Sequence, residues 1–153
     1  MPTTERFGRA PNDRRPDPPP AAPVPPAART LLELARSRLV EAAESADAAE
    51  RYAGAHLAAL RAAAGVLAAR AQPRPTRRPT SAWVLLPRVA PELGEWAAFF
   101  AAGAPKRSAA EAGLRGAVSV READDLVRAV DGFLTAVEAT LGVAVAEPMM
   151  RVG

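Results

Sequence analysis

The sequence predicts an all-α protein, a small helical bundle of three long helices and two or three short ones. Three observations predict this class. Apolar residues recur at helical spacing over three long segments, residues 30–45, 47–71 and 119–141. No segment alternates apolar and polar residues as a half-buried strand does. Alanine supplies much of the 49% apolar share and aromatic residues only 5%, so the helices must approach one another closely to fill a core.

The chain begins with a proline-rich segment, residues 1–29. Nine prolines fall within residues 1–28, with little apolar material around them. Proline fixes φ and removes the amide donor that a helix needs, so we expect a disordered tail with polyproline II character. The first helix is expected to begin at Thr30 as its N-cap and to run to Ser45. Its predicted buried stripe comprises Leu31, Leu32, Ala35, Leu39, Ala42 and Ala43.

A capping box predicts the start of the second helix, because Asp47 is followed three positions later by Glu50. We expect this helix to run to Ala71, since Pro73 and Pro75 prevent its continuation. Residues 72–80 are then a loop. The predicted buried face of the helix comprises Ala53, Leu57, Leu60, Ala64 and Leu67.

The middle of the chain is expected to form shorter elements. Residues 81–87 are a short apolar piece, either a helical turn or extended. Pro91 suits the first turn of a helix over PELGEWAAFFAAGA, and Ser108 with Glu111 has the form of a capping box for a short helix that ends near Gly116. The predicted face of the PELGEWAAFFAAGA helix comprises Leu93, Trp96, Ala97 and Phe100. The aromatic residues Trp83, Trp96, Phe99 and Phe100 are expected in the core, which we favour over base stacking by Trp83 and Trp96.

A further capping box, Ser119 with Glu122, opens the last long helix, which is expected to run to Leu141. Its stripe comprises Leu126, Val130, Phe133, Val137 and Leu141, with Val127 and Leu134 beside it. The expected organisation is therefore a tail at residues 1–29, a bundle at residues 30–142 and a frayed tail at residues 143–153.

The excess positive charge of the chain lies in the proline-rich segments. The net charge is +3 and the pI about 10.5, and residues 1–29 and 72–80 supply more than this excess, so the bundle itself is mildly acidic. A basic groove in the fold is not indicated, but a basic loop is. Its arginines, Arg74, Arg77 and Arg78, are candidates for phosphate contacts, and the alternative is a solvated linker without a partner.

Several kinds of site are excluded or disfavoured. The chain has no cysteine and one histidine, which excludes disulfides and argues against zinc, so we expect no metal and no cofactor. Glu122, Asp124 and Asp125 could form a magnesium cluster. We favour instead a structural role in the first turn of a helix, with an Asp124–Arg128 pair. No apolar leader or membrane-spanning segment is recognised, so a cytoplasmic protein is expected.

The only histidine lies in RYAGAH, residues 51–56. On an ideal helix His56 lies about 40° from Leu60, Tyr52 lies about 80° away on the same side, and Arg51 is roughly opposite. Arg51 and His56 are therefore about 140° apart. Geometry alone favours a semi-buried imidazole beside Tyr52 and a solvated arginine.

The stretch AERYAGAHLAALRAAAGVLAAR, with one amphipathic helix before it and a long one at the C-terminus, resembles the HEPN superfamily (higher eukaryotes and prokaryotes nucleotide-binding). VAPELGEWAAFFAAGA and AAEAGLRGAVSVREADDLVRAVDGFL are similar to an actinobacterial family within it. The resemblance covers residues 30–141. It implies a helical module that binds RNA, a nucleotide or a protein partner, commonly as a homodimer.

Three functional hypotheses follow from the resemblance. The favoured one is a non-catalytic binding module. The second is a metal-independent ribonuclease, in which the resemblance implies His56 as general acid or base and Arg51 at the scissile phosphate, in a cleft shared by two subunits. The third is a purely structural helical interaction protein.

Overall fold

The computed structural model describes residues 23–70 and 81–143. Predictions for residues 1–22, 71–80 and 144–153 lie outside this part of the chain. The described elements are the helices α1 (Pro26–Glu44), α2 (Ala48–Arg70), α3 (Ala82–Val89), α4 (Gly94–Ala102), α5 (Ala104–Glu111) and α6 (Val120–Leu141), with a 3₁₀ turn η1 (Pro91–Leu93). No described residue lies in a strand, and the predicted all-α class is confirmed.

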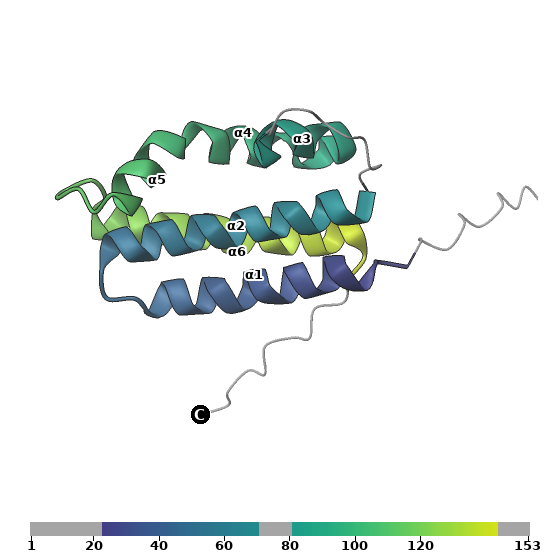
Figure 1. Cartoon of the computed structure of the whole chain (residues 1–153), viewed down its shortest axis with the longest axis horizontal. Coiled ribbons are helices and arrows are strands. Elements are labelled where there is room, and N and C mark those ends of the chain that lie inside the picture. Colours follow the sequence, from purple (N-terminus) through teal and green to yellow (C-terminus); the bar gives the residue numbers. More distant parts are fainter. Residues whose placement is uncertain (1–22, 71–80, 144–153) are drawn as a thin grey trace, which may run out of the picture.

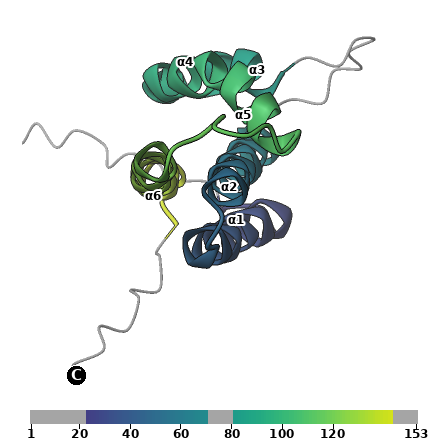
Figure 2. The ribbon, with the colours of Figure 1, turned by 90° about the vertical axis from the view of Figure 1, so that its left-hand side faces the viewer.

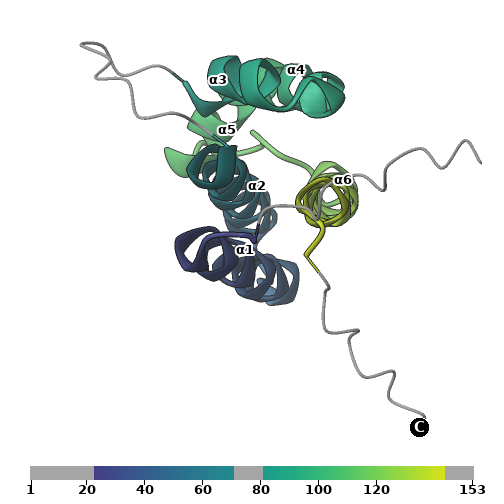
Figure 3. The same ribbon diagram turned by 90° about the vertical axis from the view of Figure 1, so that its right-hand side faces the viewer.

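The three long helices run side by side along the length of the molecule (Figure 1). Seen along their axes, α1, α2 and α6 stand at the corners of a triangle, and α3, α4 and α5 lie across the side away from α1 (Figure 2, Figure 3). Helix α2 is central, because it contacts α1, α3, α5 and α6. It is long and apolar enough to cross a membrane, but half of its most apolar window is buried against its neighbours, as in the core helix of a bundle.

Helix α1 begins at Pro26, four residues before the predicted N-cap. Proline at the start of a helix costs no hydrogen bond, since the first backbone amides have no partner within the helix. Thr30 is inside the helix, and its hydroxyl donates to the carbonyl of Pro26 (3.0 Å). The predicted tail of residues 1–29 is therefore too long, because residues 26–29 are helical.

Glycines and alanines bring α1 and α2 into close contact. A Cβ atom added at Gly54 would lie 2.9 Å from the Cβ of Ala42, and one at Gly65 would lie 3.2 Å from Leu32 Cδ2. A separation of 2.9 Å is closer than two carbon atoms can approach without repulsion. The close helix packing expected from the alanine content is confirmed.

The predicted buried face of α2 is wrong. Leu57 is 37% exposed, and Ala53, Leu60, Ala64 and Leu67 are only partly buried. The buried side is made mainly of small residues. It comprises Tyr52, Ala55, His56, Ala58, Ala59, Ala62, Ala63, Gly65 and Val66. Small residues face the neighbouring helices because these approach α2 on several sides, which leaves the leucines around one open strip.

The short elements differ in part from those predicted. Residues 82–89 are helical, and Ser81 caps them by accepting a hydrogen bond from the amide of Trp83 (3.3 Å). Helix α5 begins at Ala104 rather than at Ser108 and ends at Glu111. Proline in its first turn suits a helix start, whereas the positive φ angles of Gly113 and Gly116 do not continue a helix.

The aromatic core is formed by Trp83, Phe100 and Phe133. The rings of Trp83 and Phe100 stack at 4.8 Å, and those of Phe100 and Phe133 meet edge to face at 5.0 Å. Trp96 is partly buried against this core, so the core interpretation of both tryptophans is supported. Phe99 was expected in the core but is 51% exposed.

Helix α6 begins and ends as predicted. The side chain of Ser119 accepts from the amide of Glu122, and the side chain of Glu122 accepts from the amide of Ser119 in return. Gly142 ends the helix in the left-handed conformation, where glycine has no steric penalty. The predicted stripe is buried from Leu126 to Val137, and Leu141 is partly buried.

An ion-pair cluster joins α1 to α6. Arg36 Nε and Nη2 donate to the two carboxylate oxygens of Glu138 (2.8 and 2.9 Å). Arg36 Nη1 donates to Asp131 (2.6 Å) and Nη2 to the hydroxyl of Thr135 (3.1 Å). Glu138 is buried, and this two-point geometry compensates the loss of its hydration.

Candidate functional site

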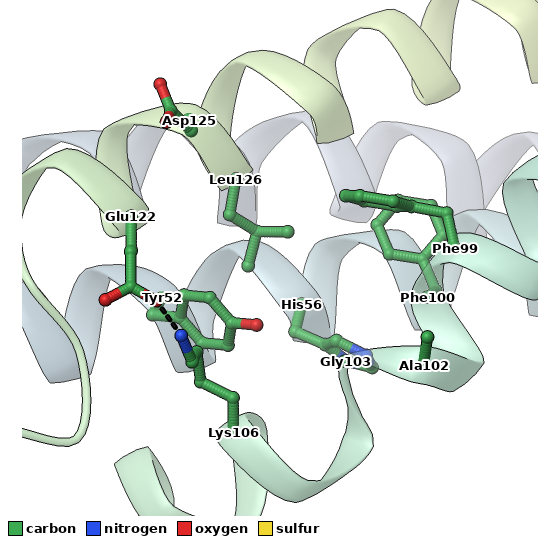
Figure 4. A pocket seen from close by; sticks show the side chains of 10 residues that line it. All are labelled: Tyr52, His56, Phe99, Phe100, Ala102, Gly103, Lys106, Glu122, Asp125 and Leu126. Carbon is green, nitrogen blue, oxygen red and sulfur yellow. Dashed lines mark ion pairs between the residues drawn. The ribbon is translucent and has the colours of Figure 1, made fainter.

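A pocket of about 400 Å³ lies where α2 and α6 meet the α4–α5 corner. Helix α2 contributes Tyr52 and His56, which are one turn apart on the same side of the helix. The close-up shows the lining side chains from all four helices (Figure 4). The remaining lining residues are Phe99, Phe100, Ala102, Gly103, Lys106, Glu122, Asp125 and Leu126.

His56 forms part of the inner wall of this pocket. The residue is 1% exposed, and its ring meets those of Trp83 and Phe100 edge to face at 5.8 and 5.9 Å. Neither ring nitrogen has a hydrogen-bond partner of ordinary geometry among the described residues. Burial lowers the pKa of His56, the charge of Arg107 lowers it further, and the backbone carbonyl of Phe100 opposes both effects. The imidazole is therefore neutral near pH 7.

Tyr52 stands beside His56 with its phenol directed along the wall. Its ring is buried, and this burial raises the pKa of the hydroxyl, so the phenol stays protonated at physiological pH. A Cβ atom at Gly103 would lie 3.4 Å from that hydroxyl oxygen. The glycine between α4 and α5 therefore leaves space at the end of the Tyr52 side chain.

The rim of the pocket carries the charged residues. Lys106 of α5 forms an ion pair with Glu122 of α6, and this pair joins the two helices at the rim of the pocket (Figure 4). Asp125, one turn further along α6, accepts from Arg128 (2.5 Å). Phe99 adds a half-exposed aromatic ring to the same rim. The pocket thus has an apolar interior and a rim of opposite charges.

The structure does not bring Arg51 to His56. Arg51 Nη1 donates to Asp124 (2.6 Å), and its Nε and Nη2 donate to the carbonyl of Ser45 (3.1 and 3.0 Å). The Arg51 side chain is 14% exposed, so the solvated arginine expected from the sequence is wrong. The guanidinium instead ties the α1–α2 turn to α6, and it does not line the pocket.

The acidic residues at the start of α6 have separate partners. Asp124 binds Arg51 and Asp125 binds Arg128, so the predicted Asp124–Arg128 pair is wrong. Within residues 23–70 and 81–143 no group of histidine, cysteine and acidic side chains could hold a metal ion. The candidate phosphate ligands Arg74, Arg77 and Arg78 lie outside the described residues.

The sequence pointed to His56 but not to the pocket around it. The position of Tyr52 one turn before His56 was a usable signal, because residues four apart share a helix face. No local sequence signal indicated Phe99, Lys106 or Leu126. These residues come from different helices, and how those helices are placed relative to one another depends on tertiary packing.

The fold is a small all-α module in which the small-residue helix α2 contacts the long helices α1 and α6 and the short helices α3 and α5. A family model described as SAV_6107-like HEPN matches residues 42–138, more than half of the chain. The protein therefore belongs to the SAV_6107-like HEPN family, and the superfamily resemblance drawn from the sequence is confirmed. No curated protein and no solved structure matches the chain.

Proposed function

We propose that this protein is a non-catalytic HEPN module that acts as a homodimer. The proposal that the module is non-catalytic rests on the separation of the two candidate catalytic groups. Arg51 is occupied by Asp124 and the Ser45 carbonyl, and His56 is a neutral, buried ring. A ribonuclease site requires a cation at the phosphate and a histidine within reach of the reacting oxygen. Within one chain neither group is available for that role.

The open strip of α2 supports pairing between two copies. Leu57 is 37% exposed, with Leu60, Ala64 and Leu67 partly exposed beside it. The strip is mainly apolar, with Arg61 one turn after Leu57, and covering its apolar surface with a partner is favourable. A second α2 presents the same apolar strip, as a two-fold interface requires.

The test of pairing is the oligomeric state of the whole chain. Light scattering should give the mass of two chains for the wild type and of one chain for Leu57→Glu, because a carboxylate on the strip loses its hydration in the dimer. Val40→Glu is the matched control, since Val40 is 58% exposed and lies one turn after Arg36, on the side of α1 that faces α6. It should remain a dimer. A monomeric wild type would end the proposal of pairing.

The absence of catalysis has a separate test. A broad panel of RNAs incubated with the protein in EDTA should remain intact. Metal-independent cleavage that disappears in His56→Ala, with the helical content of the variant preserved, would replace this proposal by the ribonuclease hypothesis.

The basic segment 72–80 is the part of the chain that favours RNA as a partner. The described residues carry 12 basic and 13 acidic side chains, so the bundle itself has little electrostatic attraction for phosphates. We assign any contact with a polynucleotide to Arg74, Arg77 and Arg78.

A further inference from the structure

We infer that the pocket between α2, α4, α5 and α6 is a binding site for a small, flat organic molecule without net negative charge. Its volume of about 400 Å³ falls within the range of small-molecule sites, roughly 300 to 1,000 Å³. It accommodates a molecule of one or two rings. The site lies within one chain, so it does not depend on the pairing proposed above.

The walls favour a flat apolar body. Phe99, Phe100 and Leu126 supply aromatic and aliphatic surface from α4 and α6, and the ring of Tyr52 closes the side formed by α2. Phe99 lines the pocket and its side chain is 51% exposed. An occupant that covers this ring removes apolar surface from water, which is a favourable contribution to binding.

The charges argue against an anionic ligand. Lys106 is the one cation among the lining residues, and it is already paired with Glu122. Asp125 adds a second carboxylate to the rim. A phosphate or carboxylate ligand would have to replace Glu122 at the ammonium group while it approaches Asp125. A neutral or cationic molecule does not compete with Glu122 for Lys106. The charge of Arg107, which lowers the pKa of His56, opposes a cation only at that side of the wall.

The unpaired imidazole of His56 is an independent indication that the pocket is incomplete. Buried polar atoms almost always have a partner, whereas neither nitrogen of this buried ring has one of ordinary geometry among the described residues. The carbonyl of Phe100 lies close enough to oppose the fall in the pKa of the ring, but it makes no well-formed hydrogen bond with it. The residue is 1% exposed and its ring nitrogens are buried, so the ring forms the inner wall of the pocket rather than a polar binding edge. An occupant that packs against this wall changes the surroundings of the imidazole, which makes His56 a reporter of binding.

Three probes of nearly the same shape test the inference. Benzamide is neutral, benzamidine is a cation and benzoate is an anion, on one flat skeleton. Titrations of the full-length protein would follow the imidazole signals of His56 by NMR, which need no assignment because the chain has one histidine. We expect benzamide or benzamidine to shift these signals saturably, with an affinity at least fivefold higher than that of benzoate.

A blocking variant separates this pocket from other surfaces. Ala102 lines the pocket and is exposed, so Ala102→Trp should fill the entrance without disturbing the core, and binding should fall at least tenfold. Ala98→Trp, also exposed and one turn earlier on α4, is the matched control and should bind as the wild type does. Leu57→Glu should also bind normally, because Leu57 does not line the pocket. Tightest binding of benzoate, unchanged binding in Ala102→Trp, or no saturable shift with any probe would overturn the inference.

Discussion

The buried imidazole of His56 makes the stability of this protein dependent on pH in a way that one substitution should remove. Burial lowers the pKa of His56 in the folded state, while the unfolded chain keeps a pKa of about 6.5. As the pH falls below 6.5 the unfolded chain therefore gains a proton that the folded chain does not. Stability is lost toward acid and is fully present above pH 6.5.

The size of this effect follows from proton linkage. While the folded ring stays neutral, the free energy of unfolding falls by up to about 1.4 kcal/mol per pH unit. Between about pH 7.5 and 5.5 the loss attributable to His56 is at most roughly 1.4 kcal/mol, the value for a folded ring that stays neutral over the whole range. No other histidine contributes, since the chain has one.

His56→Phe is the suitable perturbation. Phenylalanine retains an aromatic ring against Trp83 and Phe100, and the adjoining pocket gives room for its larger volume. It also removes two buried nitrogens that have no partner in the described structure, so the variant should fold with at least the wild-type stability near pH 7.5.

The assay is urea denaturation followed by circular dichroism at several pH values above 5.5, where most carboxylates remain ionised. The wild type should lose up to about 1.4 kcal/mol of unfolding free energy relative to His56→Phe over this range. Parallel plots of unfolding free energy against pH for the two proteins would refute the reasoning. They would mean that the imidazole titrates in the folded protein as it does in water.

Three further variants test the packing and charge arguments. Arg36→Ala should lower the free energy of unfolding by about 3 kcal/mol, because Glu138 would be left as a buried charge without its partner; a loss below about 1 kcal/mol in urea denaturation would contradict this. Gly54→Ala should destabilise despite a gain in helix propensity of about 1 kcal/mol, since the added methyl group meets Ala42 at 2.9 Å, and a higher Tm would show that α1 can move away. Replacement of the three arginines of segment 72–80 by alanine should weaken RNA binding and reduce the slope of log affinity against log salt by up to about 2, at roughly 0.7 per lost phosphate contact on single strands; an unchanged slope would remove the segment as a contact.

The ends of the helices were predictable where the signal is local. The Ser119 capping box consists of two hydrogen bonds between residues three apart, and it fixed the start of α6 in advance. The starts of α1 and α5 were missed because Thr30 and Ser108 are residue types that are common at the N-cap. In each case a proline upstream, Pro26 or Pro105, already begins the helix.

The face of α2 shows where periodicity fails. Leucine spacing identified one stripe, but alanine occurs on all sides of this helix and gives no direction of its own. Which side is buried depends on how closely α1 and α6 approach, and this approach is governed by contacts such as Gly54 against Ala42. Leu57 consequently lies on the open strip.

The amino-acid sequence by itself determined that this protein is an α-helical bundle, where its last long helix begins and ends, and which single histidine merits attention, because helix periodicity and capping act between residues a few positions apart. Only the tertiary structure decided that His56 faces Trp83 and Phe100, that Arg51 serves Asp124, and that Lys106 pairs with Glu122 at the rim of a pocket. These contacts join helices that are distant in the chain. They depend on packing distances between small side chains, which no local pattern specifies.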